Sequence, residues 1–292
     1  MRTLIIYHQI KPSVDCPDGI ASAWVVKQMH PDAELLGWHY GATGLPDVHE
    51  YDNIFVVDFS FKASVLESWR KQKKDLIVID HHKTAMADLS GFSDAIFDMN
   101  ECGATLTWET LFPNKPMPAW LEYVKDRDLW NFALEQSKEI HEAASFMGRK
   151  LRQIDWYCSL DAEKLVQALA PLGTELLRPK RERIKQLAAT ATPGTVLGNS
   201  ALMVSVPPKD ARLVSDLCSQ LYVENPGYDL ICTLTPDDAI LNRTNLSFRS
   251  DKNGGNFDVS AVAKQLNGGG HHNAAGGWIE GDLALEITFE ED

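Results

Sequence analysis

Three short apolar segments, each followed by residues that can bind a metal ion, most constrain the fold of this chain. These segments and the residues after them are Thr3–Tyr7 with His8, Ile54–Val57 with Asp58, and Leu76–Ile79 with Asp80-His81-His82. They are rich in Ile, Val and Leu without polar alternation, which is typical of parallel strands covered on both faces. Helical patterns at Gly19–Met29 and Lys62–Lys73 lie among them. The alternation predicts an α/β fold with a doubly wound, mainly parallel sheet.

The remainder of the chain predicts a helical stretch followed by a second, smaller α/β domain. The stretch from Gly103 to about Lys185 is helical in pattern, and Pro193-Gly194 interrupts it. The strands and helices expected after it are Ala201–Val206, Asp229–Thr233 and Thr244–Arg249, with helices near Ala211–Tyr222 and Val259–Leu266. We therefore predict a larger domain over 1–190, a linker over 191–198, and a smaller domain with a mixed sheet over 199–292.

Composition excludes several classes of protein. With 28 Lys+Arg against 41 Asp+Glu among 292 residues, the net charge of −13 argues against binding to duplex nucleic acid through basic charge. No segment approaches the roughly 20 apolar residues of a membrane span, and the N-terminus lacks a secretory pattern. The five cysteines are scattered and form no CxxC pair. We expect a cytoplasmic protein without disulfides.

The ends of the predicted strands favour a metal site. Ligands of open parallel sheets bind at the carboxyl ends of the strands, where His8, Asp58 and His81 would meet. Asp and neutral His together suit Mn²⁺, Fe²⁺, Co²⁺ or Zn²⁺ better than an all-oxygen site would. Two further acidic clusters, Asp15-Cys16-Pro17-Asp18 and Lys125-Asp126-Arg127-Asp128, would in isolation be a helix cap and a solvated helix end.

The C-terminal domain contains a segment suited to phosphate. Its residues run Asn267-Gly268-Gly269-Gly270-His271-His272, and small residues follow as far as Gly277. Consecutive glycines let backbone N–H groups approach an anion, and the loop could open a helix. Arg249 ends a predicted strand upstream and is a suitable phosphate clamp. A flexible linker and a surface arginine are the alternatives.

Together these residues resemble the DHH phosphoesterase superfamily, in its DHH/DHHA1 two-domain subfamily and its oligoribonuclease- or exopolyphosphatase-related group. Asp80-His81-His82 after an apolar strand matches the motif that names the family. Asp58 matches the acidic residue that ends the preceding strand, and Gly268-Gly269-Gly270-His271 matches the DHHA1 signature. The resemblance extends from His8 to Gly277 and implies a DHH catalytic domain followed by a DHHA1 substrate-binding domain.

The resemblance also implies a centre of two metal ions, commonly Mn²⁺, with Co²⁺, Mg²⁺, Fe²⁺ or Zn²⁺ as alternatives. The implied ligands are His8, Asp18, Asp58, His81 and Asp126, with Asp126 preferred over Asp128 and Asp58 bridging both ions. His82 and Asp80 would support catalysis beside the metals, while Arg249, His271, His272 and the glycines would bind phosphate. Cys16 stands where the family has an aspartate. Three alternatives follow: Cys16 binds the metal as a thiolate, Asp15 takes its place as the ligand, or the metal ion at this position is weakly bound.

The expected function is metal-dependent hydrolysis of phosphodiester or phosphomonoester bonds in short oligonucleotides or nucleotides by a metal-activated water. The alternatives are hydrolysis of polyphosphate or pyrophosphate, and a nucleotide-binding regulatory protein with a degraded metal centre. The acidic balance favours a short substrate, with no long duplex nucleic acid and no membrane as partner. The sequence does not decide whether the protein forms a homodimer.

Overall fold

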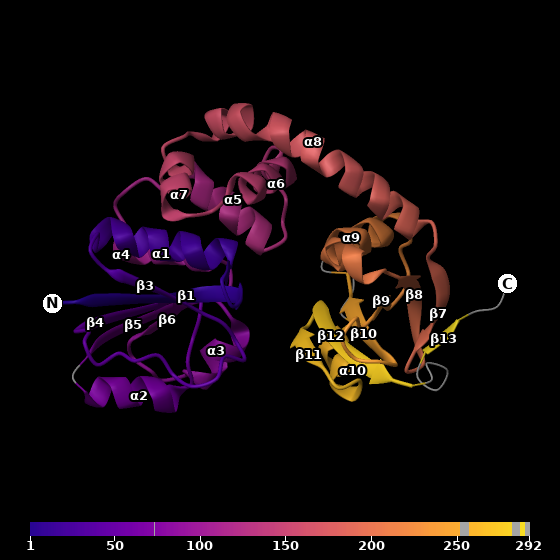
Figure 1. Ribbon diagram of the computed structural model, residues 1–292, viewed down its shortest axis with the longest axis horizontal. Coiled ribbons are helices and arrows are strands. Elements are labelled where there is room, and N and C mark those ends of the chain that lie inside the picture. Colours follow the sequence, from indigo (N-terminus) through magenta and orange to yellow (C-terminus); the bar gives the residue numbers. More distant parts are fainter. Residues whose placement is uncertain (73, 252–256, 282–286, 290–292) are drawn as a thin grey trace. The chain divides into compact units, whose positions relative to one another are not determined.

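A computed structural model describes residues 1–72, 74–251, 257–281 and 287–289 and divides the chain into two compact units, Met1–Leu177 and Arg178–Asp292 (Figure 1). The division lies inside helix α8 (Ala162–Ala188), not at the linker expected over 191–198. Strand β7 (Thr192–Val196) occupies most of that segment and pairs with β8 (Asn199–Ser205). The helical stretch ends at Ala188, ahead of Pro193 and Gly194, which lie in an extended strand.

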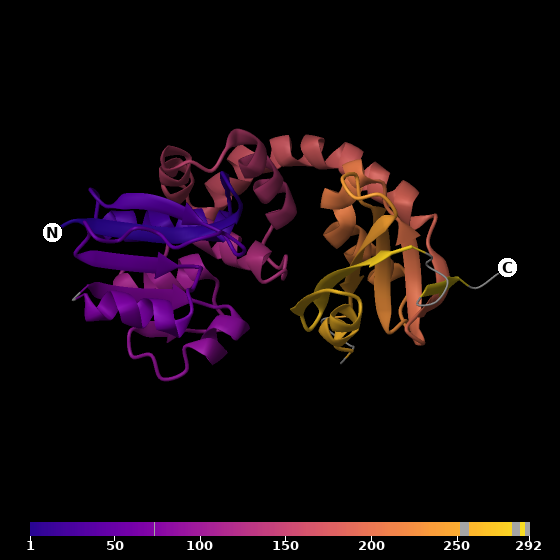
Figure 2. The same ribbon diagram turned by 60° about the horizontal axis from the view of Figure 1, so that its bottom comes forward.

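The first unit contains the predicted mainly parallel sheet. Its strands are β1 (Thr3–Lys11), β2 (Val14–Asp15), β3 (Glu34–Trp38), β4 (Asn53–Val57), β5 (Asp75–Asp80) and β6 (Ala95–Phe97). The parallel strands lie in the order β3-β1-β4-β5-β6, and β2 returns antiparallel along the end of β1 (Figure 2). The chain runs from β1 to β3 on one side and then to β4 on the other. The order therefore reverses at β1, and ligands of such sheets bind at this point.

Helices cover both faces of this sheet, which confirms the doubly wound arrangement. Ile5 and Tyr7 of β1 pack on one face with α1 (Pro17–Met29) and α4 (Gly103–Leu111). Leu4 and Ile6 point to the other face, towards α2 (Ala63–Lys71). The short helix α3 (Lys83–Asp88) follows β5. Because side chains alternate along a strand, only a nearly continuous apolar run can fill both layers.

Further helices pack on the α1 layer. They are α5 (Ala119–Asp128), α6 (Ser137–Met147) and α7 (Leu151–Cys158), ahead of α8. Both α5 and α7 contact α1, and the Trp24 indole N–H donates to Asp155 of α7 over 2.6 Å. Among the described residues, none of the helices combines the length and apolar character needed to cross a membrane.

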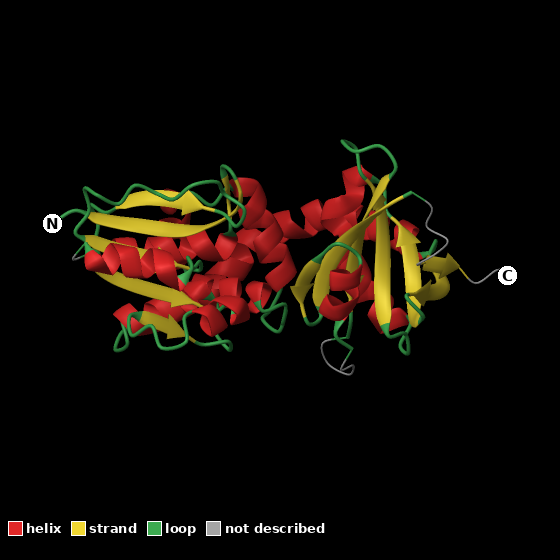
Figure 3. Ribbon diagram, turned by 90° about the horizontal axis from the view of Figure 1, so that it is seen from below, coloured by secondary structure: helices red, strands yellow, loops and turns green. Residues whose placement is uncertain are grey.

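The second unit contains the predicted mixed sheet, and helices cover both of its faces (Figure 3). Its strands lie in the order β11-β12-β10-β9-β8-β7-β13, and among the strands that the structure describes only β8 and β9 pair in parallel. The elements not yet given are the 3₁₀ helix η1 (Pro208–Leu213), α9 (Val214–Glu224), β9 (Leu230–Pro236), β10 (Arg243–Arg249), α10 (Val259–Gln265), β11 (Gly269–His271), β12 (Ala274–Glu280) and β13 (Ile287–Phe289).

The glycine-rich segment forms strand pairs and does not open a helix, which corrects that expectation. Gly269, Gly270 and His271 make up β11 and pair antiparallel with β12. A Cβ at Gly268 would come within 1.9 Å of the Gly276 carbonyl oxygen. The glycines here let two backbone segments approach closely.

Candidate metal centre

Three strands bring their polar residues to one edge of the first sheet. His8 follows the last pair between β1 and β4, Tyr7 with Val57, and Asp58 directly follows β4. His81 follows β5, the neighbour of β4. Asp58 has a left-handed backbone with φ of 52°. This conformation is uncommon outside glycine, tolerated best by Asp and Asn, and concentrated at functional sites.

The β1–β2 hairpin and the first turn of α1 bring Cys16 and Asp18 to the same edge. The Cys16 backbone N–H donates to the His8 carbonyl over 3.3 Å. The Asp18 carboxylate accepts from the backbone N–H groups of Gly103 (2.6 Å) and Ala104 (2.8 Å) at the start of α4. The exposed N–H groups of that helix end hold the carboxylate in place.

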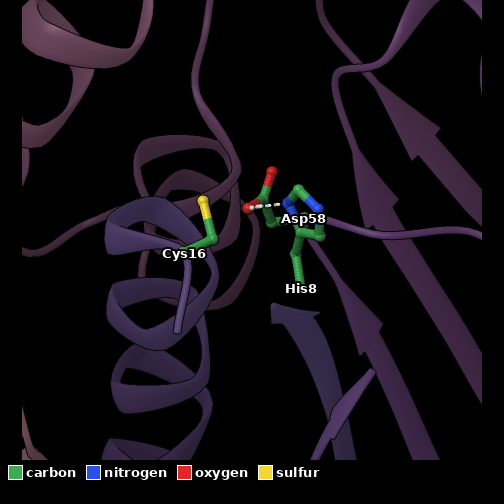
Figure 4. Close-up of side chains that lie close together, drawn as sticks. All are labelled: His8, Cys16 and Asp58. Atoms are coloured by element: carbon green, nitrogen blue, oxygen red, sulfur yellow. Dashed lines mark ion pairs between the residues drawn. The ribbon is translucent and has the colours of Figure 1, made fainter. Parts of the chain in front are cut away.

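The side chains fall into three overlapping groups whose potential ligand atoms lie within 4.8 Å of one another. These groups are His8–Cys16–Asp58, Asp58–His81–His82 and Asp18–His81–Asp128. Figure 4 shows the first, in which the His8 imidazole, the Cys16 thiol and the Asp58 carboxylate converge. Asp58 and His81 each belong to two groups. Such sharing is the arrangement expected for adjacent metal ions with a bridging carboxylate.

The chemistry of the donors fits a metal ion better than it fits a hydrogen-bonded core. Asp58 is 1% exposed, yet neither carboxylate oxygen has a hydrogen-bond partner within the described part of the chain. One oxygen lies 3.4 Å from His8 Nδ1 and the other 3.3 Å from His81 Nε2. His8 Nδ1 is likewise buried without a partner in this part. Buried polar atoms normally form hydrogen bonds, so carboxylate and imidazole atoms that converge on one point without a hydrogen bond indicate a cation site.

Electrostatics points the same way. Burial and the charges of Asp58 and Asp128 raise the pKa of Asp18. Burial would lower the pKa of His81, but its contact with Asp58 and the charges of Asp18 and Asp128 outweigh burial and raise it to about 10. The clustered carboxylates thus strongly stabilise a positive charge placed among them. A divalent cation would provide that charge.

Asp80 holds His82 rather than facing the centre. One of its oxygens lies 2.7 Å from His82 Nδ1 and accepts from the His81 backbone N–H over 2.8 Å. The other oxygen accepts from the Ser60 hydroxyl over 2.7 Å. Asp80 is fully buried with both oxygens engaged. It therefore fixes the ring of His82 and leaves Nε2 as the atom able to exchange a proton.

The structure brings Asp128, not Asp126, to the centre, which corrects the preference drawn from the sequence. Asp128 Oδ2 lies 3.5 Å from His81 Nε2. The Asp126 carboxylate accepts from the backbone N–H groups of Ala133 (2.8 Å) and Leu134 (3.2 Å) and so organises the following loop. Asp126 and Asp128 are two residues apart on helix α5, so their side chains point in different directions.

Asp15 is also engaged away from the centre. One of its oxygens accepts from the Tyr7 hydroxyl (2.9 Å) and the Gln9 side-chain amide (2.8 Å). Of the alternatives left open at this position, the geometry favours Cys16. No sequence signal marked Gly103 as the donor to Asp18, because its role comes from a backbone N–H group.

The phosphate-binding candidates lie in the second unit. Arg249 and His271 both pair in register with Ala274 on either side of β12, at one end of that sheet. The Arg249 guanidinium contacts the Phe248 carbonyl (2.9 Å) and the Ser215 hydroxyl (3.3 Å). His272 lies 3.7 Å from Asp258 and is 45% exposed. The side chain of His271 lies outside the described part of the structure.

Comparisons with known proteins agree with this architecture. No family model matches the chain. An uncharacterized protein of Acanthamoeba polyphaga mimivirus is 26% identical over 318 residues, which cover 97% of this chain and 69% of that protein. A solved DHH domain from a member of a family of ribosomal proteins is 14% identical, with a TM-score of 0.58, and covers 99% of this chain and 83% of its own. The chain has the DHH fold.

Two further solved structures share the DHH fold. The pGpG-specific phosphodiesterase PggH of Vibrio cholerae matches with a TM-score of 0.55 and 13% identity, covering 96% of this chain and 94% of that protein. The exonuclease RecJ bound to manganese matches with a TM-score of 0.50 and 16% identity, covering 97% of this chain and 86% of that protein. The resemblance predicted from the sequence motifs is thus confirmed for the fold.

Proposed function

We propose that this protein is a metal-dependent phosphoesterase of the DHH superfamily that hydrolyses phosphodiester bonds in short oligonucleotides. The observation that carries the proposal is Asp58, whose buried oxygens lack a hydrogen-bond partner in the described chain, lie within ion-pair distance of His8 and His81, and are shared between two groups of potential ligands. The proposed ligands are His8, Cys16, Asp18, Asp58, His81 and Asp128. Divalent cations held there would supply an activated water and neutralise a phosphoryl oxygen.

The side chains of this chain perform the remaining tasks. Asp80 holds Nδ1 of His82, so that Nε2 is free to protonate the leaving oxygen of the substrate. Burial alone would lower the pKa of His82, but the hydrogen bond that Nδ1–H donates to Asp80 outweighs burial and raises this pKa, which keeps a proton available. The backbone N–H groups at the start of α4 keep Asp18 oriented through each turnover. Arg249, His271, His272 and the backbone of Gly268–Gly270 are proposed to bind phosphate.

The substrate class rests on charge and on related folds. A net charge of −13 repels a long polyanion over much of the surface, whereas a dinucleotide interacts mainly with the site itself. PggH is a phosphodiesterase specific for a dinucleotide, and RecJ is an exonuclease with manganese bound. We propose Mn²⁺ as the metal and the cytoplasm as the location.

Replacement of Asp58 tests the proposal. Asn keeps the size of the side chain and tolerates the left-handed backbone at φ of 52°, but it removes the bridging charge. Asp58→Asn is expected to lower kcat/KM for diadenylate by at least about a thousandfold in Mn²⁺ while the melting temperature stays within a few degrees. Hydrolysis is measured by chromatography of the products, and metal affinity by calorimetry.

Asp52→Asn provides the matched control, since Asp52 is exposed on the same chain and its side chain accepts from the Arg2 backbone N–H. It should keep full activity. Asp58→Asn with wild-type activity would contradict the metal assignment. Wild-type protein that cleaves polyphosphate but no dinucleotide would contradict the substrate class, and binding of nucleotides without any hydrolysis would indicate a regulatory protein.

A further inference from the structure

Two hydroxyl-bearing residues of α9 lie on the same face of the helix as a buried cysteine. Ser215, Cys218 and Tyr222 follow one another at spacings of three and four residues, which places them on one side of the helix. Cys218 is 1% exposed, so this side faces the interior of the second unit. Strand β9 is in contact with α9. The hydroxyls of Ser215 and Tyr222 are therefore within reach of the sheet, and both bind at Arg249.

The Tyr222 hydroxyl connects two strands at the position of Arg249. It donates to the Arg249 carbonyl and accepts from the Ile231 backbone N–H over 3.1 Å. Ile231 of β9 and Arg249 of β10 are register partners, and Arg249 is the last residue of its strand. Because the end of a strand ladder opens most easily, this hydroxyl fixes the backbone from which the arginine side chain projects.

The residue that follows Arg249 is held by a second connection. The Ser250 backbone N–H donates to the Asn273 carbonyl over 3.2 Å, and the Ser250 hydroxyl accepts from the Asn273 side-chain amide over 2.9 Å. Asn273 lies in the turn between β11 and β12, and Ser250 is 6% exposed. The chain is thus held both at Arg249 and directly after it.

The Arg249 guanidinium contacts neutral acceptors in the described part of the chain. Its Nη1 donates to the Phe248 carbonyl over 2.9 Å and lies 3.5 Å from the Ala275 carbonyl oxygen. Its Nη2 donates to the Ser215 hydroxyl over 3.3 Å. Among the described residues no carboxylate pairs with this arginine. Its charge is therefore available to an anion from outside the chain.

The same contacts leave donors of the guanidinium unused. A guanidinium has five N–H donors in a rigid plane. The two carbonyls occupy Nη1 and the Ser215 hydroxyl occupies one donor of Nη2, so Nε–H and one N–H of Nη2 remain in the described chain. Two free donors on a charged planar group suit a phosphate, which accepts through several oxygens.

We propose that Ser215 and Tyr222 are positioning residues for Arg249 and thereby set the affinity of the second unit for a substrate phosphate. Tyr222 fixes the backbone at Arg249, and Ser215 fixes the direction of its guanidinium. An arginine that is already ordered loses less conformational entropy when it binds a ligand. The inference rests on the proposed phosphoesterase function, in which Arg249 binds phosphate.

Kinetics with diadenylate in Mn²⁺ test the proposal on full-length Tyr222→Phe and Ser215→Ala, each of which removes one hydroxyl. Either change should raise KM by about threefold to tenfold, the effect of one lost hydrogen bond, while kcat stays within about twofold. Only KM rises because Arg249 is expected to bind the substrate and the transition state equally well. Partial unfolding would instead lower the apparent kcat and leave KM unchanged, and that result would overturn the proposal.

Two further variants serve as controls for these substitutions. Tyr228→Phe is the matched control for Tyr222→Phe, since both tyrosines pack against the same apolar cluster. It should have the kinetics of the wild type. Ser215→Thr keeps a hydroxyl and should restore the wild-type KM that Ser215→Ala loses. A rise in KM of the same size in Tyr228→Phe would contradict the assignment to Tyr222.

A double-mutant cycle shows whether the two hydroxyls act through Arg249. In an Arg249→Gln background, Tyr222→Phe and Ser215→Ala should raise KM no further, because the group that they position is gone. If each change still raises KM by the same factor in that background, the hydroxyls act independently of Arg249 and the proposal is wrong.

A binding measurement makes the test independent of hydrolysis. Calorimetry with inorganic pyrophosphate and metal-free protein should show binding by the wild type and by Tyr228→Phe that is weakened by about threefold to tenfold in Tyr222→Phe and Ser215→Ala. If the wild type hydrolyses nothing but this binding difference is present, the proposed function fails and the positioning role stands. If diadenylate is hydrolysed while KM and pyrophosphate binding are equal in all four proteins, the proposed function stands and the positioning role is wrong.

Discussion

A single thiol among oxygen and nitrogen donors is the unusual residue of this centre. Cys16 lies with His8 and Asp58 in one group, whereas Asp18, His81 and Asp128 form a group without sulfur. Burial and the charges of Asp58 and Asp18 raise the pKa of Cys16. A bound cation reverses that effect, because a coordinating thiol is deprotonated outright. Thiolate selects softer ions than carboxylate does.

We therefore predict that Co²⁺ bound to the wild type produces a thiolate-to-metal charge-transfer absorption in the near ultraviolet. Cys16→Ser and Cys16→Asp should both lack this absorption, and Cys16→Asp should bind Mn²⁺ more tightly relative to Zn²⁺. Absorption titration and competition calorimetry measure the two effects. An unchanged spectrum in Cys16→Ser would exclude the thiol from the metal centre.

The sequence predicts individual residues well where strand and motif coincide. His8, Asp58 and His81 each follow an apolar segment of a parallel strand, and these segments end at one edge of the sheet. Asp126 and Asp128 differ by two positions in the same helix, and only the direction of each side chain separates their roles. That direction depends on how α5 packs against the rest of the unit, and the local sequence pattern does not predict this packing.

At the scale of elements, the last turn of α5 carries two acidic residues, Asp126 and Asp128, that have different roles. Asp126 holds the loop after the helix through two backbone N–H groups, and Asp128 faces the metal centre. Asp126→Ala is expected to lower the free energy of unfolding by about 1–3 kcal/mol, because it removes two charge-assisted hydrogen bonds from backbone N–H groups of the following loop. Urea unfolding measures this loss.

Asp128→Asn should give the opposite pattern. It removes charge from a group of crowded carboxylates, so the free energy of unfolding should not fall. Metal affinity measured by calorimetry should fall by at least about tenfold. Lower metal affinity in Asp126→Ala with full affinity in Asp128→Asn would restore Asp126 as the ligand.

Elements with a strong pattern were predictable and weakly patterned ones were not. The apolar runs of β1, β4 and β5 predict parallel strands, and both faces of the sheet are indeed covered. β3 (Glu34–Trp38) is only partly buried and carries no continuous apolar run. The glycine segment was expected to open a helix, but pairing with β12 satisfies its backbone instead. Such pairing depends on a distant strand, so local sequence gives no sign of it.

At the scale of the whole molecule, acidic pH should weaken the fold through His141. This residue of α6 is 4% exposed, and its Nε2–H donates to the Tyr123 carbonyl over 2.6 Å. Burial, reinforced by the charges of Arg127 and Arg149, lowers the pKa of His141 from 6.5 to about 3. Between these values the unfolded chain binds a proton that the folded chain does not. Stability is therefore complete above about pH 6.5 and falls as the pH drops towards 3.

The expected slope is up to about 1.4 kcal/mol per pH unit from this residue. Urea unfolding at pH 7, 6, 5 and 4.5 measures it, with His141→Gln as the matched variant that keeps a donor to Tyr123. The wild type should lose more stability than His141→Gln over this range. Parallel curves for the two proteins would contradict the assignment.

Two glycines of the first unit have no space for a side chain. A Cβ at Gly103 would lie 2.6 Å from that of Asp58 and 3.0 Å from Asp18 Oδ2, and a Cβ at Gly19 would lie 2.4 Å from the His8 carbonyl oxygen. In a saturation mutagenesis screen scored on the proposed activity, both positions should be as intolerant as the proposed metal ligands, although neither offers a side-chain atom to a metal or a substrate. A catalogue of essential positions in this protein would therefore include residues whose contribution is the volume they leave empty.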